Sequence, residues 1–338
     1  MQIDPFVAGL PKAELHVHLE GTLEPDMLFA LAQRNGISLD YATEAEVLAA
    51  YDFHDLPSFL KVYYAAMDVL RAEQDFYDLT WAYFVKAAAQ NVVYCEPFFD
   101  PQAHTVRGVD FATVIAGITA AQRDAASQLG VQSNLIMCFL RDMSAASAKA
   151  HLDMVKPYLD NIIGVGLDSD EKDNPPAKFA DVFAEARSLG LKLTMHCDLN
   201  QKDIVEHLWE CLDLIQVDRI DLGINALDDP ALVDAIVERG LGLTVCPVSN
   251  EFVVQNLTGS EIRSFLQHGV KATVNSDDPA YFRGYMNENY QALKDKAAFT
   301  NAEIVQLAAN AFDISWAASA DKARYLQQLQ DYVAQQQP

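Results

Sequence analysis

The stretch "AELHVHLEG" (13–21) begins the first of eight short apolar runs that have the composition of β-strands. The other seven are "NVVYCEPFF" (91–99), "SNLIMCFL" (133–140), "IIGVGLDS" (162–169), "LKLTMHCD" (191–198), "DRIDLGI" (218–224), "GLTVCPVS" (242–249) and "VKATVNSDD" (270–278). Amphipathic segments such as 179–190 and 230–240 lie between them, each ending at a glycine as helices commonly do. Alternating strands and helices predict a parallel sheet, and eight repeats predict an α/β fold of the closed (β/α)₈ TIM-barrel type. A doubly wound open sheet is the alternative.

A longer segment, 22–90, separates the first two predicted strands. It contains three helical patterns, "DMLFALAQRNG" (26–36), "LPSFLKVYYAAMDVL" (56–70) and "DFYDLTWAYFVKAAAQ" (75–90). We therefore expect a helical insertion after the first strand that forms a lid or flank at the barrel mouth. Because no linker-like stretch interrupts the chain, we expect a single barrel domain over 1–338.

The composition narrows the class of partner. With 51% apolar and 21% charged residues, the chain has the balance of an ordinary globular protein. Its formal net charge of −24 argues against nucleic acid and against an anionic membrane surface, since both require basic patches. A small-molecule substrate is the expected partner.

The cysteines and the N-terminal stretch indicate the cellular compartment in which the protein is expected. The five cysteines are an odd number without a CxxC pair, which favours free thiols in a reducing compartment. The N-terminal stretch has neither a basic start nor a long apolar segment, so we expect no signal peptide. These features predict a cytoplasmic location.

Polar residues stand where several predicted strands end. In a TIM barrel the active site lies at the carboxyl ends of the strands. The residues at these ends are His16 and His18 on the first strand, Glu96 on the second, Asp168 on the fourth, His196 on the fifth, and Asp277 and Asp278 on the eighth. Because side chains alternate along a strand, the first two histidines face the same side. Three histidines and a carboxylate make a ligand set suited to zinc.

Each of these signals has a simpler interpretation when taken alone. A single His-x-His pair can be structural, His196 can be a core histidine bonded to a carbonyl, and "NSDDP" (275–279) can be a turn. Four candidate ligands at the ends of strands one, five and eight are less easily explained in this way. A zinc ion at such a site would generate hydroxide near neutral pH, and a neighbouring acid or base would have to manage the protons.

Several long stretches resemble the adenosine deaminase family of the amidohydrolase superfamily, and most closely its adenine deaminase branch. They are "LPKAELHVHLEGTLEP" (10–25), "LRAEQDFYDLTWAYFVKAAAQNVVYCEPFFDPQ" (70–102), "GVGLDSDEKDNPPAKF" (164–179), "LTVCPVSN" (243–250) and "ATVNSDDPAYF" (272–282). The resemblance runs from about residue 8 to 330. It implies a metal-dependent hydrolase that binds one Zn²⁺ and deaminates a 6-aminopurine through metal-bound hydroxide.

The resemblance also implies roles for individual residues. The residues that match the zinc ligands are His16, His18, His196 and Asp277, the last of which is also a catalytic candidate. Asp278 matches the catalytic carboxylate that hydrogen-bonds a ring nitrogen of the purine. The loop that shapes the substrate pocket contains Asp168, Ser169 and Glu171.

Two positions depart from the family pattern. After strand five the family has His-Ala-Gly-Glu, whereas "HCDLN" (196–200) places Leu199 at the glutamate. After strand six the family has a histidine before a glycine, whereas "RIDLGI" (219–224) has Leu222 there. Both leucines are expected to contact substrate, and Asp198 is the candidate to take over the proton transfer.

The departures leave three functions open. The first is a deaminase in which Asp198 or Asp278 covers the missing roles. The second is a divergent metalloenzyme that acts on a non-purine small molecule. The third is a weakly active or inactive binding homologue that keeps its metal.

Overall fold

A computed structural model describes residues 2–336 of the chain. Its ten strands form two sheets in which every recorded pairing between strands is parallel, with the orders β1-β2-β4 and β10-β9-β8-β7-β6-β5-β3. The strands are β1 (Lys12–Glu14), β2 (Val92–Cys95), β3 (Phe98–Phe99), β4 (Gln132–Ser133), β5 (Leu135–Leu140), β6 (Ile162–Asp168), β7 (Lys192–Cys197), β8 (Arg219–Leu222), β9 (Gly242–Val245) and β10 (Lys271–Val274).

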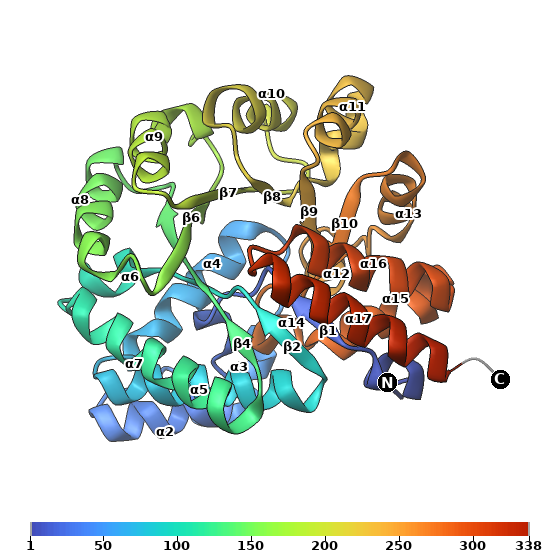
Figure 1. The fold of residues 1–338 in the computed structure, drawn as a ribbon. Helices are drawn as coiled ribbons and strands as arrows, with labels where there is room; N and C mark the ends of the chain where they lie inside the picture. Colours follow the sequence, from blue (N-terminus) through green and yellow to red (C-terminus); the bar gives the residue numbers. More distant parts are fainter. Residues whose placement is uncertain (1, 337–338) are drawn as a thin grey trace.

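The two sheets belong to one barrel of eight strands, which Figure 1 shows ringed by helices. β2 and β3 are two halves of one strand, as are β4 and β5, because β2 pairs with β4 and β3 pairs with β5. The residues after β1 close the ring: the Asp277 N–H donates to the His16 carbonyl and the His18 N–H to the Asp277 carbonyl, both at 3.0 Å. On the other side, the Phe98 N–H donates to the Val17 carbonyl at 2.8 Å. The predicted TIM barrel is confirmed, and the open sheet is wrong.

Helices connect successive strands around the outside of the barrel (Figure 1). The main ones are α7 (Phe111–Asp124), α8 (Ala145–Val155), α9 (Ala180–Ser188), α10 (Ile204–Trp209), α11 (Pro230–Glu238), α13 (Gly259–His268), α16 (Asn301–Ile314) and α17 (Ser319–Gln335). Shorter or peripheral helices are α1 (Pro5–Gly9), α6 (Pro101–Thr105), α12 (Pro247–Val254), α14 (Pro279–Phe282) and α15 (Met286–Ala297). The two segments expected to be helical from their final glycines are α9 and α11.

The segment 22–90 is helical, as predicted. It contains α2 (Pro25–Asn35), α3 (Glu44–Ala50), α4 (Leu56–Ala66) and α5 (Glu73–Ala89). The sequence patterns found three of these helices and missed α3, a seven-residue helix that Thr43 caps by accepting the Glu46 N–H at 3.3 Å. Residues of α4 line the pocket described below, so the insertion reaches the barrel mouth.

Two further features of the fold concern the cysteines and the character of the helices. The five cysteines are buried and none of them forms a disulfide. Over residues 2–336, no helix combines the length and the apolar character needed to cross a bilayer.

Candidate metal centre and active site

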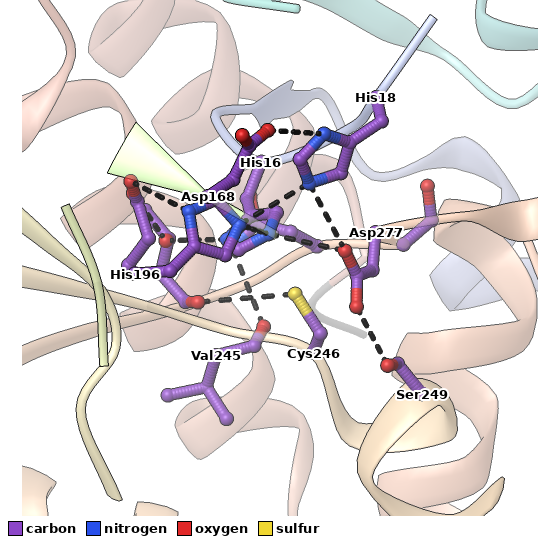
Figure 2. A network of polar contacts seen from close by, with 12 residues as sticks. His16, His18, Asp168, His196, Val245, Cys246, Ser249 and Asp277 are labelled. Carbon is purple, nitrogen blue, oxygen red and sulfur yellow. Dashed lines mark hydrogen bonds and ion pairs between the residues drawn. The ribbon is translucent and has the colours of Figure 1, made fainter. Parts of the chain in front are cut away.

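Three imidazoles and one carboxylate converge at the carboxyl end of the barrel (Figure 2). His16 and His18 follow β1, His196 is in β7, and Asp277 follows β10. The His196 Nε2 atom lies 3.0 Å from His16 Nε2 and 3.2 Å from His18 Nε2. The Asp277 Oδ1 atom lies 3.1 Å from His16 Nε2 and 3.5 Å from His18 Nε2. Four potential ligand atoms therefore surround one point.

The Nδ1 atoms explain why the Nε2 atoms face that point. His16 Nδ1 lies 2.9 Å from the Thr244 hydroxyl, and His196 Nδ1 lies 3.1 Å from the Leu167 carbonyl. His18 Nδ1 lies 3.5 Å from Asp168 Oδ2. An Nδ1–H that donates in each of these directions leaves a lone pair on each Nε2.

This donor set fits a divalent metal. Lone pairs and a carboxylate oxygen held 3.0–3.5 Å apart repel one another unless a cation lies among them. Ligand atoms bound about 2.0–2.1 Å from one zinc ion lie roughly 3 Å from one another, which is close to the spacing here. The predicted ligands His16, His18, His196 and Asp277 are thus brought together in a metal-binding arrangement.

The protonation behaviour of the ligands agrees with this fit. Burial, together with the neighbouring His196, lowers the pKa of His18 to about 3. Burial and His16 hold the pKa of His196 well below its usual value. Burial also opposes charge on the His16–Asp277 pair, but their mutual attraction raises the pKa of His16 and lowers that of Asp277. Two imidazoles are therefore neutral near pH 7, and a metal would take the place of the proton that the pair shares.

The local backbone conformation directs the Asp277 side chain toward the three histidine ligands. Its φ of +65° lies in the left-handed region, which aspartate tolerates better than most residues. The Ser249 hydroxyl, in α12, donates to Asp277 Oδ2 at 2.6 Å and leaves Oδ1 facing the histidines. Sequence reasoning did not identify Ser249, although it lies in the stretch "LTVCPVSN" (243–250) that carries the family resemblance.

A cavity opens above the metal ligands. Several predicted site residues line it, namely His18, Asp168, Ser169, His196, Asp198, Leu199, Leu222, Asp277 and Asp278. An apolar part of the wall comes mainly from α4 and α12, with Leu56, Phe59, Leu60, Val253, Val254 and Phe282. His16 is fully buried beneath the cavity.

Glu96 is not at the pocket, contrary to its expected place at a strand end. The strand continues as β3 beyond the interruption at Pro97, so its end is at Asp100, which lines the cavity. The Glu96 carboxylate lies inside the barrel, where it accepts a 2.5 Å hydrogen bond from Arg219. The apolar run "NVVYCEPFF" extends past Glu96, which was the signal for the later strand end.

Glu171 lies behind the pocket wall and is fully buried. Its carboxylate accepts hydrogen bonds from the Asp198 N–H at 2.8 Å and from His207 Nδ1 at 2.7 Å, and it lies 3.5 Å from Arg141. Arg141 in turn donates to the His196 carbonyl at 2.9 Å. Glu171 therefore shapes the pocket by holding the segment that presents Asp198.

The polar wall of the cavity is formed by the carboxyl groups of Asp100, Asp168, Asp198 and Asp278, and several of their oxygens lack a hydrogen-bond partner. The Oδ1 atoms of Asp100, Asp168 and Asp278 have no hydrogen-bond partner among the described residues, and Asp168 Oδ2 has the 3.5 Å contact with His18 Nδ1 but no shorter hydrogen bond. Burial raises the pKa of Asp168 to about 7. Burial, with the nearby charges of Asp277 and Glu171 respectively, raises the pKa values of Asp278 and Asp198 well above the usual range. Buried polar atoms of this kind require a ligand or water to satisfy them.

The two leucines at the departing positions both face the cavity. Leu199 is 8% exposed and Leu222 is 6% exposed, so each mainly excludes water from the space beside the ligands. Leu222 has a φ of +62°, an uncommon conformation for a bulky residue and one that is concentrated at functional sites.

Gly21, in "HVHLEG" (16–21), is required by the close approach of Asp278. A Cβ atom at this position would lie 2.0 Å from Asp278 Oδ1 and 2.8 Å from its Cα. We expect Gly21→Ala to lower the free energy of unfolding by about 1–3 kcal/mol, the usual cost of overpacking, and to displace Asp278. Urea unfolding measures the change, with Gly284→Ala as a control because its nearest neighbour is a side-chain methyl at 3.1 Å. Equal effects of the two substitutions would contradict the prediction.

Comparisons with known proteins agree with this site. The family model described as adenosine deaminase matches residues 11–332. An adenine deaminase of Sphingopyxis alaskensis is 50% identical over 330 residues, which cover 97% of this chain and 96% of the relative. The crystal structure of an adenine deaminase from Arthrobacter aurescens has a TM-score of 0.93 at 42% identity, covering 96% of this chain and 100% of its own. A cog1816 amidohydrolase from Burkholderia ambifaria with bound zinc has a TM-score of 0.89 at 29% identity, covering 99% and 96%.

These comparisons bear on the three functions that the sequence left open. The similarity extends over nearly the whole chain, and it gives no support to the interpretation of Leu199 and Leu222 as lost catalytic residues that alter the substrate or the chemistry. The buried cluster of His16, His18, His196 and Asp277, together with the zinc-bound structure of similar fold, supports a divalent metal. The chain is a metal-dependent hydrolase that belongs to the adenosine deaminase family.

Proposed function

We propose that this protein binds one Zn²⁺ and catalyses the hydrolytic deamination of adenine to hypoxanthine and ammonia. The observation that carries the proposal is the convergence of three Nε2 atoms and one carboxylate oxygen at the base of a cavity with unpartnered carboxyl groups. The choice of adenine is supported by relatives of 46–50% identity that are named adenine deaminases.

The ligand cluster would supply the hydrolytic chemistry. When bound by His16, His18, His196 and Asp277, zinc lowers the pKa of a water molecule to about 7 and polarises the group under attack. The Ser249 hydroxyl keeps Asp277 turned toward this position.

The polar wall would hold the purine. Asp278 would hydrogen-bond a ring nitrogen of the base through its carboxyl group, because this residue lines the cavity beside the metal ligand Asp277. Asp168 and Ser169 occupy the same cavity and orient the ring edge, and the Ser169 hydroxyl is itself fixed by a 2.8 Å hydrogen bond from Tyr64 in α4. The insertion thereby contributes to substrate binding.

Asp198 would deliver the proton that the purine ring needs as its amino-bearing carbon is attacked. It lines the cavity and lies two residues after His196, one residue nearer than Leu199. The hydrogen bond from its N–H to Glu171 fixes the backbone that presents it. Leu199 and Leu222 would exclude bulk water from the reacting group.

The same two leucines favour a second candidate function. An apolar wall beside a metal site also suits a non-purine small molecule, with altered hydrolytic chemistry on the same ligands. A binding homologue that only retains metal is the third possibility. Substrate turnover distinguishes these three functions.

The test is a comparison of adenine, adenosine and AMP as substrates of the zinc-loaded native protein. We expect ammonia and hypoxanthine to appear from adenine in a 1:1 ratio, and to disappear when the metal is removed by a chelator. Ammonia from adenosine alone would change the assigned substrate. No ammonia from any of the three, with one zinc bound per chain, would overturn the proposed deamination.

A further inference from the structure

We propose that Thr244, held in place by Asp221, fixes the tautomer of His16 and thereby sets the affinity of the site for its metal. The inference rests on the proposed metal centre, but it concerns metal binding and does not depend on which substrate is turned over. Thr244 is in β9 and Asp221 is in β8, and both are fully buried below the cavity.

The hydrogen bonds of the Thr244 hydroxyl allow only one assignment of donor and acceptor. The Thr244 hydroxyl donates to Asp221 Oδ1 at 2.9 Å, which uses its single proton. Its oxygen also lies 2.9 Å from His16 Nδ1 and can therefore only accept there. His16 must carry its proton on Nδ1, so the Nε2 lone pair is available to a metal.

Asp221 is itself held rigidly. Its Oδ2 atom accepts a 2.6 Å hydrogen bond from Thr194 in β7, and Oδ1 lies 3.8 Å from Arg219 Nε. Arg219 is fixed by Glu96 and by Trp316, whose ring centre is 4.3 Å from the guanidinium carbon. The receiving oxygen therefore cannot turn away from Thr244 without breaking several buried contacts.

The strand register brings this chain of contacts under the metal ligands. His196 pairs with Asp221 across β7 and β8, and Asp221 pairs with Thr244 across β8 and β9. Asp221 Oδ2 also lies 3.8 Å from His196 Nδ1, so a carboxyl group stands beneath two of the ligands. A negative group at this position favours binding of a cation above it.

His16 needs this support more than the other two histidines do. His196 bonds to a backbone carbonyl and His18 faces Asp168, whereas His16 depends on one side-chain hydroxyl. Its Nε2 atom is 3.1 Å from Asp277 Oδ1, so a proton on Nε2 would be stabilised by Asp277 in the metal-free protein. That alternative tautomer blocks the ligand atom. Thr244 counteracts it by giving the Nδ1–H an acceptor in a site that water does not reach.

The test compares Thr244→Val, which has nearly the same shape without the hydroxyl, with Thr244→Ser, which keeps the hydroxyl. Zinc affinity is measured by competition with a chelator. We expect Thr244→Val to bind zinc about 10–100-fold more weakly and Thr244→Ser to bind within about threefold of the native protein, as is typical for partners of ligating histidines. Thr273→Val is the matched control, because the hydroxyl of this buried threonine in the adjacent β10 donates to the Leu243 carbonyl at 3.2 Å and accepts from Asn275 at 3.0 Å, and forms no hydrogen bond with a histidine.

A second measurement reads the tautomer directly. In metal-free protein with ¹⁵N-labelled histidine, Nδ1 of His16 should carry a proton in the native chain and should lose it in Thr244→Val. If Thr244→Val does not fold, Asp221→Asn serves instead, since the amide can donate to the hydroxyl and reverse its direction. Equal zinc affinity in Thr244→Val, Thr273→Val and native protein, or a native His16 that carries no proton on Nδ1, would overturn the inference. Native protein that binds zinc with this pattern but releases no ammonia would overturn only the proposed deamination.

Discussion

Replacing His196 by alanine is expected to reduce bound metal from about one ion per chain to a small fraction of that. His196 Nε2 is the atom nearest to both other histidine nitrogens, at 3.0 and 3.2 Å, so its loss opens one full side of the site. Zinc held at this site would lower the pKa of a water molecule to about 7, so without the metal ammonia release should fall below detection. Elemental analysis after gel filtration measures the metal, and an ammonia assay measures the activity.

The matched control is His268→Ala. His268 is an exposed histidine in the last turn of α13, and its Nδ1 atom bonds to the Ser264 carbonyl. This variant should retain native metal content and activity. Native metal content in the His196→Ala protein would contradict the assignment of the metal centre.

Replacing Asp198 by asparagine is expected to lower kcat by about 10²–10⁴-fold, the usual contribution of a positioned acid or base. The amide cannot carry the proton, but it has nearly the same shape and leaves the backbone hydrogen bond to Glu171 in place. Because Asp198 is not a metal ligand, zinc content should stay at one per chain. Steady-state kinetics and metal analysis on the same sample test both statements.

Asp203→Asn provides the control for this second experiment. Asp203 is an exposed acid five residues further along the chain, at the start of α10. The substitution should leave kcat within about twofold of the native value. If Asp198→Asn behaves in the same way, another group transfers the proton.

Much of the barrel and of the metal centre could be predicted from the sequence, for a physical reason. Buried parallel strands require continuous apolar runs, and polar residues at their ends meet at one face of the barrel. His16, His18, His196 and Asp277 are therefore recognisable as a group even though 261 positions separate the first from the last (277 − 16).

Residues whose role depends on strand register could not be predicted. Thr244 lies within the apolar run "GLTVCPVS" and looks like any strand residue; the register of β8 and β9 brings it to Asp221, and closure of the barrel brings it to His16. The position of Asp100 was missed because Pro97 interrupts the strand without ending it. Glu171 was expected in the pocket loop, but burial of its carboxylate against Arg141 and His207 could not be inferred from its sequence position.

The central claim is that the native chain deaminates adenine with leucines at positions 199 and 222. The most direct test compares the zinc-loaded native protein with the double variant Leu199→Glu, Leu222→His, measuring ammonia release from adenine. We predict turnover by the native protein at a rate at least equal to that of the double variant, because Asp198 carries the proton and the leucines shape the wall. No turnover by the native protein, with turnover by the double variant, would contradict this account and show that a deaminase site has been put to another use.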